Sequence, residues 1–318
     1  MNFNCYSLIL HICCVILAAA IVFLSLKLRR LLGKSGSADE KTEPGPIEAA
    51  SDKALLEEIE QGLKNGEFKM YLQFIVDNKT KQIVSAEGLS RWEKPNGELV
   101  FPGYYLPAME KAGLITRLDY YMFEKACRKL EEWKGSEFGN ITISCNVTRA
   151  TISESDFVSR LKEISDRYTF DNTKLIIEIT EDTLEKNLDD AIQNIISVKE
   201  LGFSIALDDI GSGYAALRNL CEYPIDIVKM DREILLLTKT KKAQKLFLGI
   251  IALAHNLGLS VVCEGVETDE QNRFVSESDC DHIQGLYYSK GIAEARTEDF
   301  VRDYTTKLAS DAKTKEND

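Results

Sequence analysis

Short apolar runs alternate with longer amphipathic runs some eight times over about 255 residues, from Ser51 to near the end of the chain. This alternation favours a (β/α)₈ barrel, because each strand must be covered by a helix before the next parallel strand can be reached. The strands are expected at Lys69–Val76, Ile83–Leu89, Asn140–Val147, Lys174–Thr180, Phe203–Asp208, Ile225–Asp231, Leu259–Glu264 and His282–Tyr288.

Helices are expected around these strands. Their predicted ranges are Ser51–Asn65, two helices within Tyr104–Trp133 that break at Gly113, Glu154–Tyr168, Leu184–Leu201, a short helix near Ala215–Cys221, Lys241–Leu257, Glu267–Ser278 and Glu298–Leu308.

Polar residues stand near the carboxyl end of nearly every predicted strand. They are Glu87, Asn146, Glu178, Asp208 with Asp209, Lys229, Glu264 and Gln284. In a barrel these ends converge on one face, so the side chains are expected to lie together whatever their separation in sequence. Any one of them alone is more simply read as a surface or capping residue.

The segment Phe203–Tyr214 carries two adjacent acids directly before a glycine-rich turn. Neighbouring side chains on a regular strand point to opposite faces. Asp208 and Asp209 are therefore expected to bind two ions, or one ion and its water, and not to coordinate the same ion together.

Carboxylates with one amide oxygen form a hard ligand set that suits Mg²⁺ or Mn²⁺ better than zinc. The chain has only three histidines, and none ends a strand beside the acids. Two such ions are typical of phosphodiester displacement. Glu264 and Lys229 are then candidates for the base and for the positive group that holds the water. Arg91 is a candidate phosphate ligand, with a surface salt bridge as the alternative.

The composition limits which partners the protein can bind and which redox compartment it occupies. The net charge of −12 argues against binding a nucleic-acid duplex, although bound metal ions would still permit a phosphate substrate. The eight cysteines include no C-x-x-C pair, which indicates free thiols in a reducing compartment.

The N-terminal run Tyr6–Leu26 is almost entirely apolar and is followed at once by basic residues. It is long enough to cross a bilayer as a helix, and the positive-inside rule places the rest of the chain in the cytoplasm. A cleaved signal peptide is the alternative, but a basic segment before the apolar run is missing. We therefore expect a single-pass protein of the inner or plasma membrane.

The domain organisation combines these features. We expect a transmembrane anchor with its basic flank at 1–30, a flexible linker at 31–50, a catalytic barrel at 51–308 and a polar tail at 309–318.

Seven motifs, taken in order, resemble those of the EAL-domain family of cyclic di-GMP phosphodiesterases. They are Ala86–Trp92 (AEGLSRW), Ser144–Val147 (SCNV), Ile177–Glu181 (IEITE), Asp208–Tyr214 (DDIGSGY), Val228–Asp231 (VKMD), Glu264–Glu267 (EGVE) and Ile283–Gly285 (IQG). The resemblance covers about Asp52 to Asp303, nearly all of the chain beyond the predicted linker.

The resemblance implies a barrel with one strand reversed, two Mg²⁺ or Mn²⁺ ions, and hydrolysis of cyclic di-GMP to linear pGpG. It implies that the first ion is held by Glu87, Asn146, Glu178 and Asp208, and that Asp209 helps to hold the second. It implies that Lys229 is the catalytic lysine, that Glu264 is the general base supported by Glu267, and that Gln284 lies near the water. It further implies that Leu89 and Arg91 bind the substrate and that Glu181 braces the Asp208 loop. It also implies a homodimer.

Two other functions stay open on the sequence alone. One is a catalytically inactive domain that senses cyclic di-GMP or docks a protein. The other is a metal-dependent barrel enzyme that acts on a different phosphoester. Domains of the first kind usually lack a ligand or the base, and none is lost here.

Overall fold

The computed structural model describes residues 46–181, 183, 189–210, 220 and 222–316. Residues 52–318 belong to one compact unit. The predicted membrane anchor lies outside the described residues, and so does most of the predicted short helix near Ala215–Cys221. No helix within the described ranges combines the length and the apolar character needed to cross a bilayer.

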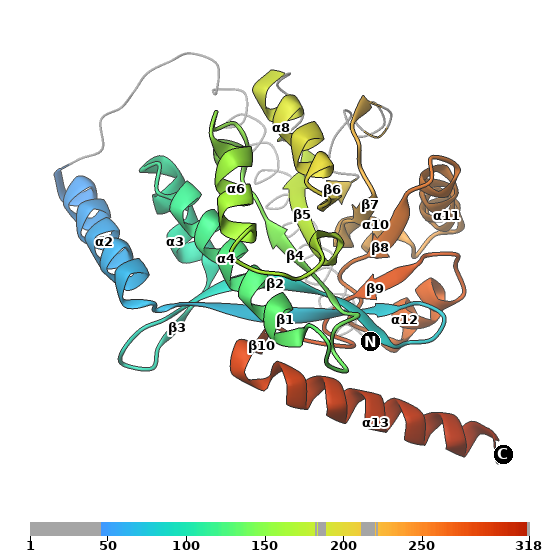
Figure 1. Cartoon of the computed structure of the whole chain (residues 1–318). Helices are drawn as coiled ribbons and strands as arrows, with labels where there is room; N and C mark the ends of the chain where they lie inside the picture. Colours follow the sequence, from blue (N-terminus) through green and yellow to red (C-terminus); the bar gives the residue numbers. More distant parts are fainter. Residues whose placement is uncertain (1–45, 182, 184–188, 211–219, 221, 317–318) are drawn as a thin grey trace, which may run out of the picture. The chain divides into compact units, whose positions relative to one another are not determined.

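Eight strands close into a barrel (Figure 1). They are β1 (Phe68–Asp77), β2 (Ile83–Glu93), β4 (Thr142–Asn146), β5 (Leu175–Thr180), β6 (Ser204–Ile210), β7 (Ile227–Met230), β8 (Ser260–Cys263) and β9 (His282–Gln284). Each pairs with its neighbour in the order β1-β9-β8-β7-β6-β5-β4-β2, and the pairing of β1 with β2 completes the ring. The predicted barrel is confirmed.

One strand of the ring runs against the others. β1 pairs antiparallel with both β2 and β9, whereas every other neighbouring pair around the ring is parallel. The hairpin between β1 and β2 explains this direction, because a short turn can only join antiparallel strands. The reversed strand implied by the family resemblance is therefore present.

β2 is longer than the sequence suggests and continues to Glu93. Only Ser85–Gly88 pair with β4, while β1 accompanies β2 as far as Trp92. Two short strands, β3 (Leu99–Val100) and β10 (Ile292–Ala293), add to β2 and β1. The β1–β2 hairpin thus extends beyond the barrel, and Glu87 lies in the middle of its strand and not at the end.

Helices surround the strands (Figure 1). They are α2 (Pro46–Asn65), α3 (Pro102–Lys111), α4 (Ile115–Trp133), α5 (Arg149–Ile152), α6 (Phe157–Ser165), α8 (Asp189–Glu200), α10 (Arg232–Leu237), α11 (Lys241–Asn256), α12 (Asp269–Ser276) and α13 (Thr297–Glu316), with single 3₁₀ turns at Asn172–Lys174 and Glu294–Arg296.

The helix ends reflect local chemistry. Thr268 caps α12 through a reciprocal capping box with Gln271, which fixes the turn directly after Glu267. Gly258, with φ of +77°, follows α11 and reverses the chain into β8.

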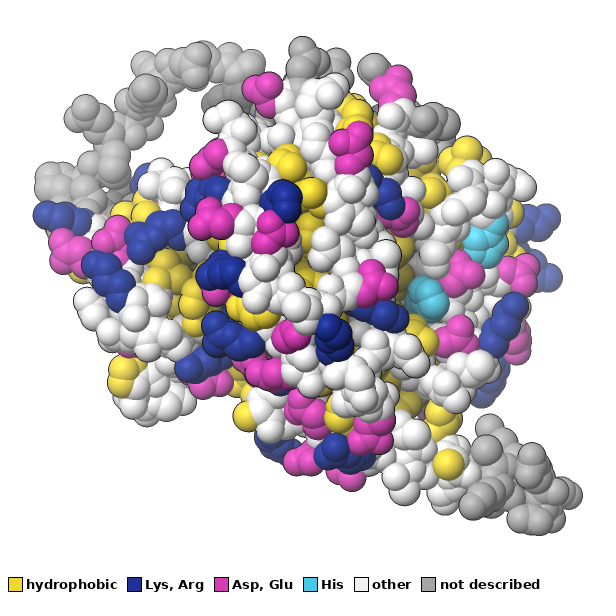
Figure 2. Space-filling view, in the orientation of Figure 1, with side chains coloured by type: hydrophobic (Ala, Val, Ile, Leu, Met, Phe, Trp, Pro, Cys, Tyr) yellow, Lys and Arg dark blue, Asp and Glu magenta, His cyan; other side chains and the backbone are white. Residues whose placement is uncertain are grey.

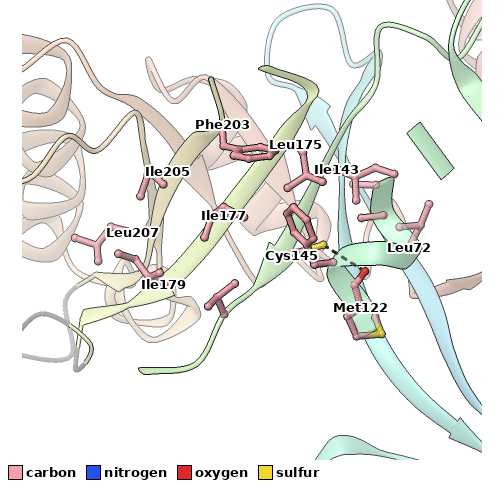
Figure 3. Packing of buried hydrophobic residues seen from close by; sticks show 14 of the residues in the cluster. Leu72, Met122, Ile143, Cys145, Leu175, Ile177, Ile179, Phe203, Ile205 and Leu207 are labelled. Atoms are coloured by element: carbon pink, nitrogen blue, oxygen red, sulfur yellow. Dashed lines mark hydrogen bonds between the residues drawn. The ribbon is translucent and has the colours of Figure 1, made fainter. Parts of the chain in front are cut away.

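The core lies between the outer face of the strands and the helices. Figure 3 shows Ile143 and Cys145 of β4, Ile177 and Ile179 of β5, and Ile205 and Leu207 of β6 packed in succession. Alternate residues of each strand face this layer, as the period of two requires. Burying these side chains against α4 and its neighbours leaves the intervening polar residues facing the barrel axis.

The surface carries interspersed charges of both signs, with no single-sign field on the face in view (Figure 2). The expectation that the domain does not bind a nucleic-acid duplex stays a prediction.

Candidate active site

The ammonium group of Lys229 lies among four carboxylates. Its Nζ is 2.7 Å from Glu264 Oε1, 3.3 Å from Glu87 Oε2 and 3.6 Å from Asp208 Oδ1, and it also donates to Glu178 Oε1. Lys229 is only 2% exposed. Strands β2, β5, β6, β7 and the segment after β8 therefore deliver their predicted polar residues to one place.

Each carboxylate oxygen of Glu87 accepts a hydrogen bond from a side-chain amide. Asn146 Nδ2 donates to Glu87 Oε1 at 2.9 Å, and Gln284 Nε2 donates to Glu87 Oε2 at 2.7 Å. Glu87 faces Ser144 in the pairing with β4, and Asn146 faces Glu178 in the pairing with β5. In this register Glu87 lies level with the middle of β4, two residues before Asn146 at its end, and Asn146 in turn lies level with Glu178.

The adjacent acids do not obey regular strand alternation. The pairing of β6 with β7 shifts between Leu207 and Ile210, and Asp209 adopts a left-handed φ of +60°. Asp is one of the few residue types that tolerates this conformation, and a bulge re-aims side chains. Carboxylate oxygens of Asp208, Asp209 and Glu264 consequently lie within 4.8 Å of one another. The expectation that the two acids face opposite sides was wrong at this bulge.

Burial and mutual repulsion control the charges of the acids. Burial, followed by Glu264 and Glu87, raises the pKa of Asp208 to about 9. Burial also raises the pKa of Glu264, although Lys229 opposes that rise. For Glu87 burial is outweighed by Lys229 and by the two amide donors, so its pKa is lowered. Burial disfavours the charged form of Lys229, yet Glu87 and Glu264 outweigh it and raise its pKa.

The donor set fits a hard divalent cation. A second group, formed by Glu87, Glu178 and Glu264, also brings carboxylate oxygens within 4.8 Å of one another. Glu178 Oε2 and Gln284 Oε1 are buried without a hydrogen-bond partner among the described residues. Buried oxygen atoms need such a partner or a cation. Carboxylate and amide oxygens are the ligands that Mg²⁺ and Mn²⁺ prefer.

A pocket of about 320 Å³ opens on this cluster and is lined by Gln73, Glu87, Arg232, Glu264, Gly265, Glu267, Gln284, Gly285 and Leu286. A groove of about 970 Å³ shares Gln73 and Leu286 with the pocket, and Leu89 and Arg91 line the groove. The two predicted substrate residues therefore lie beside the acid cluster and not within it.

Arg91 is held by aromatic rings. Its guanidinium carbon lies 5.1 Å from the ring centre of Phe101 and 5.9 Å from that of Tyr71, and Nη1 donates to the Ser90 carbonyl at 2.8 Å. No carboxylate in the described ranges forms an ion pair with Arg91. The alternative of a surface salt bridge is thus not favoured.

Two supporting glutamates have different surroundings. Glu267 Oε2 pairs with Arg232 Nη2 at 2.9 Å, so its support of Glu264 stays a prediction. Both carboxylate oxygens of Glu181 are buried without a partner among the described residues. The loop that Glu181 was expected to brace, Asp208–Tyr214, lies outside those residues from position 211 onward, so this role also stays a prediction.

Two residues of the site escaped the sequence analysis. Gln73 accepts a hydrogen bond from Gln284 Nε2 at 3.4 Å and itself donates to the Ser289 carbonyl at 3.0 Å. Its signal was a lone amide within an apolar strand. Arg232 packs so closely against Gly265 that a Cβ on this glycine would lie 2.5 Å from the Arg232 side chain. In the sequence, the glycine of the EGVE motif was the feature that could have indicated this close contact.

The protein is thus a (β/α)₈ barrel with one reversed strand and a buried carboxylate cluster suited to divalent metal ions. The EAL domain family model matches residues 56–291, and the chain belongs to that family. The resemblance drawn from its motifs is confirmed.

Three similar proteins illustrate the family. The cyclic di-GMP phosphodiesterase NbdA of Pseudomonas aeruginosa is 29% identical over 259 residues, which is 81% of this chain and 33% of NbdA. The cyclic di-GMP phosphodiesterase RocR of the same organism is 29% identical over 262 residues, 81% of this chain and 65% of RocR. The solved PaMucR phosphodiesterase in its cyclic di-GMP complex is 27% identical, with a TM-score of 0.72, and the match covers 76% of this chain and 99% of that one. The chain thus spans about a third of the length of NbdA and about two thirds of that of RocR.

Proposed function

We propose that this protein is a metal-dependent phosphodiesterase that hydrolyses cyclic di-GMP to linear pGpG. The observation that carries the proposal is that the buried ammonium of Lys229 is surrounded by Glu87, Glu178, Asp208 and Glu264. The sequence also keeps every ligand and catalytic position that the family resemblance implies. The names of NbdA and RocR support cyclic di-GMP as the substrate.

The chain's acids are assigned to metal binding by their positions. Glu87, Asn146, Glu178 and Asp208 would hold one ion, and Asp209 would help to hold a second. Bound Mg²⁺ or Mn²⁺ supplies positive charge that stabilises the attacking and leaving oxygens of a phosphodiester. Asp208, with its pKa raised to about 9 by burial and neighbouring acids, would lose its proton when a cation is near.

The remaining residues handle the water and the substrate. Glu264 takes a proton from the attacking water, and its raised pKa suits it to that role. The new bond joins phosphorus to the water oxygen and the bond to the 3′ oxygen breaks. That oxygen takes up a proton from solvent and leaves as the 3′ hydroxyl of pGpG, which balances the proton that Glu264 took from the attacking water. Lys229 and Gln284 hold the water, while Arg91 binds the phosphate that is not attacked.

Location and assembly are part of the proposal. The apolar run Tyr6–Leu26, followed by basic residues, supports a single membrane anchor with the barrel in the cytoplasm, at the inner or plasma membrane. A homodimer is proposed from the family resemblance. Light scattering of the detergent-solubilised chain would report twice the chain mass if the dimer forms and the single chain mass if it does not.

The substrate assignment is tested by comparing cyclic di-GMP, pGpG and bis(p-nitrophenyl) phosphate with the full chain in Mg²⁺ and in Mn²⁺. We expect pGpG to accumulate from cyclic di-GMP and to be consumed much more slowly. Tight binding of cyclic di-GMP without product would indicate a sensor or docking module instead. Faster turnover of the generic diester would indicate a different phosphoester substrate.

A further inference from the structure

Phe101 occupies a position that favours a different kind of residue. It is the N-cap of α3, with extended φ and ψ of −90° and 155°, and its side chain makes no capping hydrogen bond. Ser, Thr, Asp or Asn at such a position contributes about 1 kcal/mol to helix stability. Phe101 forgoes that contribution and leaves 58% of its surface exposed. Local stability therefore does not explain this aromatic ring.

The ring of Phe101 lies on the wall of the substrate groove. Leu89, Arg91 and Phe101 line the same groove of about 970 Å³, and Gln73 and Leu286 line both this groove and the pocket of the acid cluster. The Arg91 guanidinium lies 5.1 Å from the centre of the Phe101 ring. A cation that can bind a phosphate thus stands directly beside an exposed aromatic face.

An exposed apolar residue by itself is common on protein surfaces and needs no explanation. Tyr104, one turn further along α3, is equally exposed at 60%, yet it is absent from the groove wall. What distinguishes Phe101 is the combination of an unused capping position, contact with Arg91 and access to the groove.

We propose that Phe101 is a specificity-determining residue whose ring stacks on a purine base of the substrate while Arg91 binds the adjoining phosphate. The inference rests on the proposed function, because it assigns a part of the same substrate to this wall. Stacking of a nucleobase on an aromatic side chain contributes about 1–3 kcal/mol by alanine substitution, and every base offers a face for it. A ligand that carries both a phosphate and a planar base would engage both residues together.

The test uses Phe101→Ser in the full chain, with Tyr104→Ser as the matched control and Phe101→Trp as the rescue. Serine supplies the missing helix cap, so the variant should fold at least as stably as the wild type. We expect KM for cyclic di-GMP to rise about 5- to 150-fold with kcat nearly unchanged, because stacking is made equally in the ground and transition states. Phe101→Trp should retain the wild-type KM, and Tyr104→Ser should change neither constant.

A second readout separates base stacking from an effect through Arg91. The dissociation constants of cyclic di-GMP and of inorganic phosphate are measured by calorimetry in the Glu264→Gln background, with and without Phe101→Ser. Weakening of the dinucleotide alone supports the proposal. Equal weakening of both ligands, an unchanged KM in Phe101→Ser, or an equal KM rise in Tyr104→Ser would overturn it. If the wild type neither binds nor hydrolyses cyclic di-GMP, the proposed function fails, which is a distinct result.

Discussion

At the scale of single residues, the site holds more buried acidic groups than basic ones. Lys229 Nζ lies within 3.6 Å of oxygens of Glu87, Asp208 and Glu264, and one ammonium cannot neutralise all of these acids. The raised pKa of Asp208 is the result, since burial and the neighbouring acids disfavour its charged form. Bound cations would reduce the repulsion between these acids, so the buried cluster itself favours metal binding.

Replacing Glu264 by Gln should abolish turnover and leave substrate binding measurable. The amide keeps the size of the side chain but cannot accept the proton of the attacking water. General bases contribute about 10²–10⁴-fold, so kcat should fall by at least about 100-fold. Glu277→Gln, at the exposed end of α12, is the control and should behave as the wild type. Hydrolysis at the wild-type rate by Glu264→Gln would remove Glu264 as the base.

Asp119, which lies away from the site, should make the free energy of unfolding depend on pH. It is 7% exposed and its Oδ2 accepts hydrogen bonds from Thr148 and Thr151, and burial raises its pKa to about 6 from 3.8. The folded state holds this proton more tightly than the unfolded state. The stabilisation is therefore complete below about pH 4 and is lost as the pH rises through about 6, on the order of 3 kcal/mol in all.

The measurement is urea unfolding of Asp119→Asn and of the wild type at intervals from pH 4 to pH 7. The stability of the variant minus that of the wild type should grow with pH over this range, because the neutral amide does not ionise. A difference that is flat with pH would show that Asp119 titrates normally in the fold.

At the scale of elements, the turn after β9 holds Gln284 in place. A Cβ on Gly285 would lie 2.1 Å from the Val266 carbonyl oxygen, which is closer than any real contact. That carbonyl accepts the backbone N–H of Tyr287 at 3.0 Å, and the Val266 N–H donates to the Gln284 carbonyl at 3.2 Å. The segments after β8 and β9 are thus tied together by backbone groups that cannot move apart freely.

Gly285→Ala should accordingly destabilise the fold by about 1–3 kcal/mol, the usual range for forced overpacking, and should lower activity by displacing Gln284. Gly249→Ala is the control, because it lies inside α11 with no atom within 4 Å of its Cβ position, and alanine favours a helix. Thermal unfolding measures both. Equal midpoints for Gly285→Ala and the wild type would show that the turn is less closely packed.

The elements also show what a sequence can and cannot predict. Strand and helix order could be inferred from periodicity, and the convergence of Glu178, Lys229 and Glu264 could be inferred from the barrel alone. The bulge that turns Asp209 could not be foreseen, because a left-handed residue in a strand leaves no periodic signal. The final strand was predicted as His282–Tyr288 but ends at Gln284, since Gly285 packs against the neighbouring backbone. A tertiary contact, and not a local preference, decided where this last strand ends.

At the scale of the whole molecule, metal binding should be coupled to stability. An acidic protein with a buried carboxylate cluster gains stability from any cation that binds only the folded state, by about 2.7 kcal/mol at 100 times the dissociation constant. The midpoint of thermal unfolding should therefore rise on adding Mg²⁺ or Mn²⁺ to chelator-treated protein. Asp208→Asn should reduce this rise. An unchanged midpoint in the wild type at saturating metal would contradict a metal site in the barrel.

Whether the barrel is a metal-dependent enzyme is best decided by the rate of cyclic di-GMP hydrolysis by the full chain. The protein is treated with a chelator, divided, and assayed with no metal, with Mg²⁺ and with Mn²⁺ while pGpG is monitored by chromatography. We expect no product without metal and catalytic turnover to pGpG when either ion is restored. Undiminished turnover without metal, or none from folded protein that binds both metal and cyclic di-GMP, would contradict this expectation.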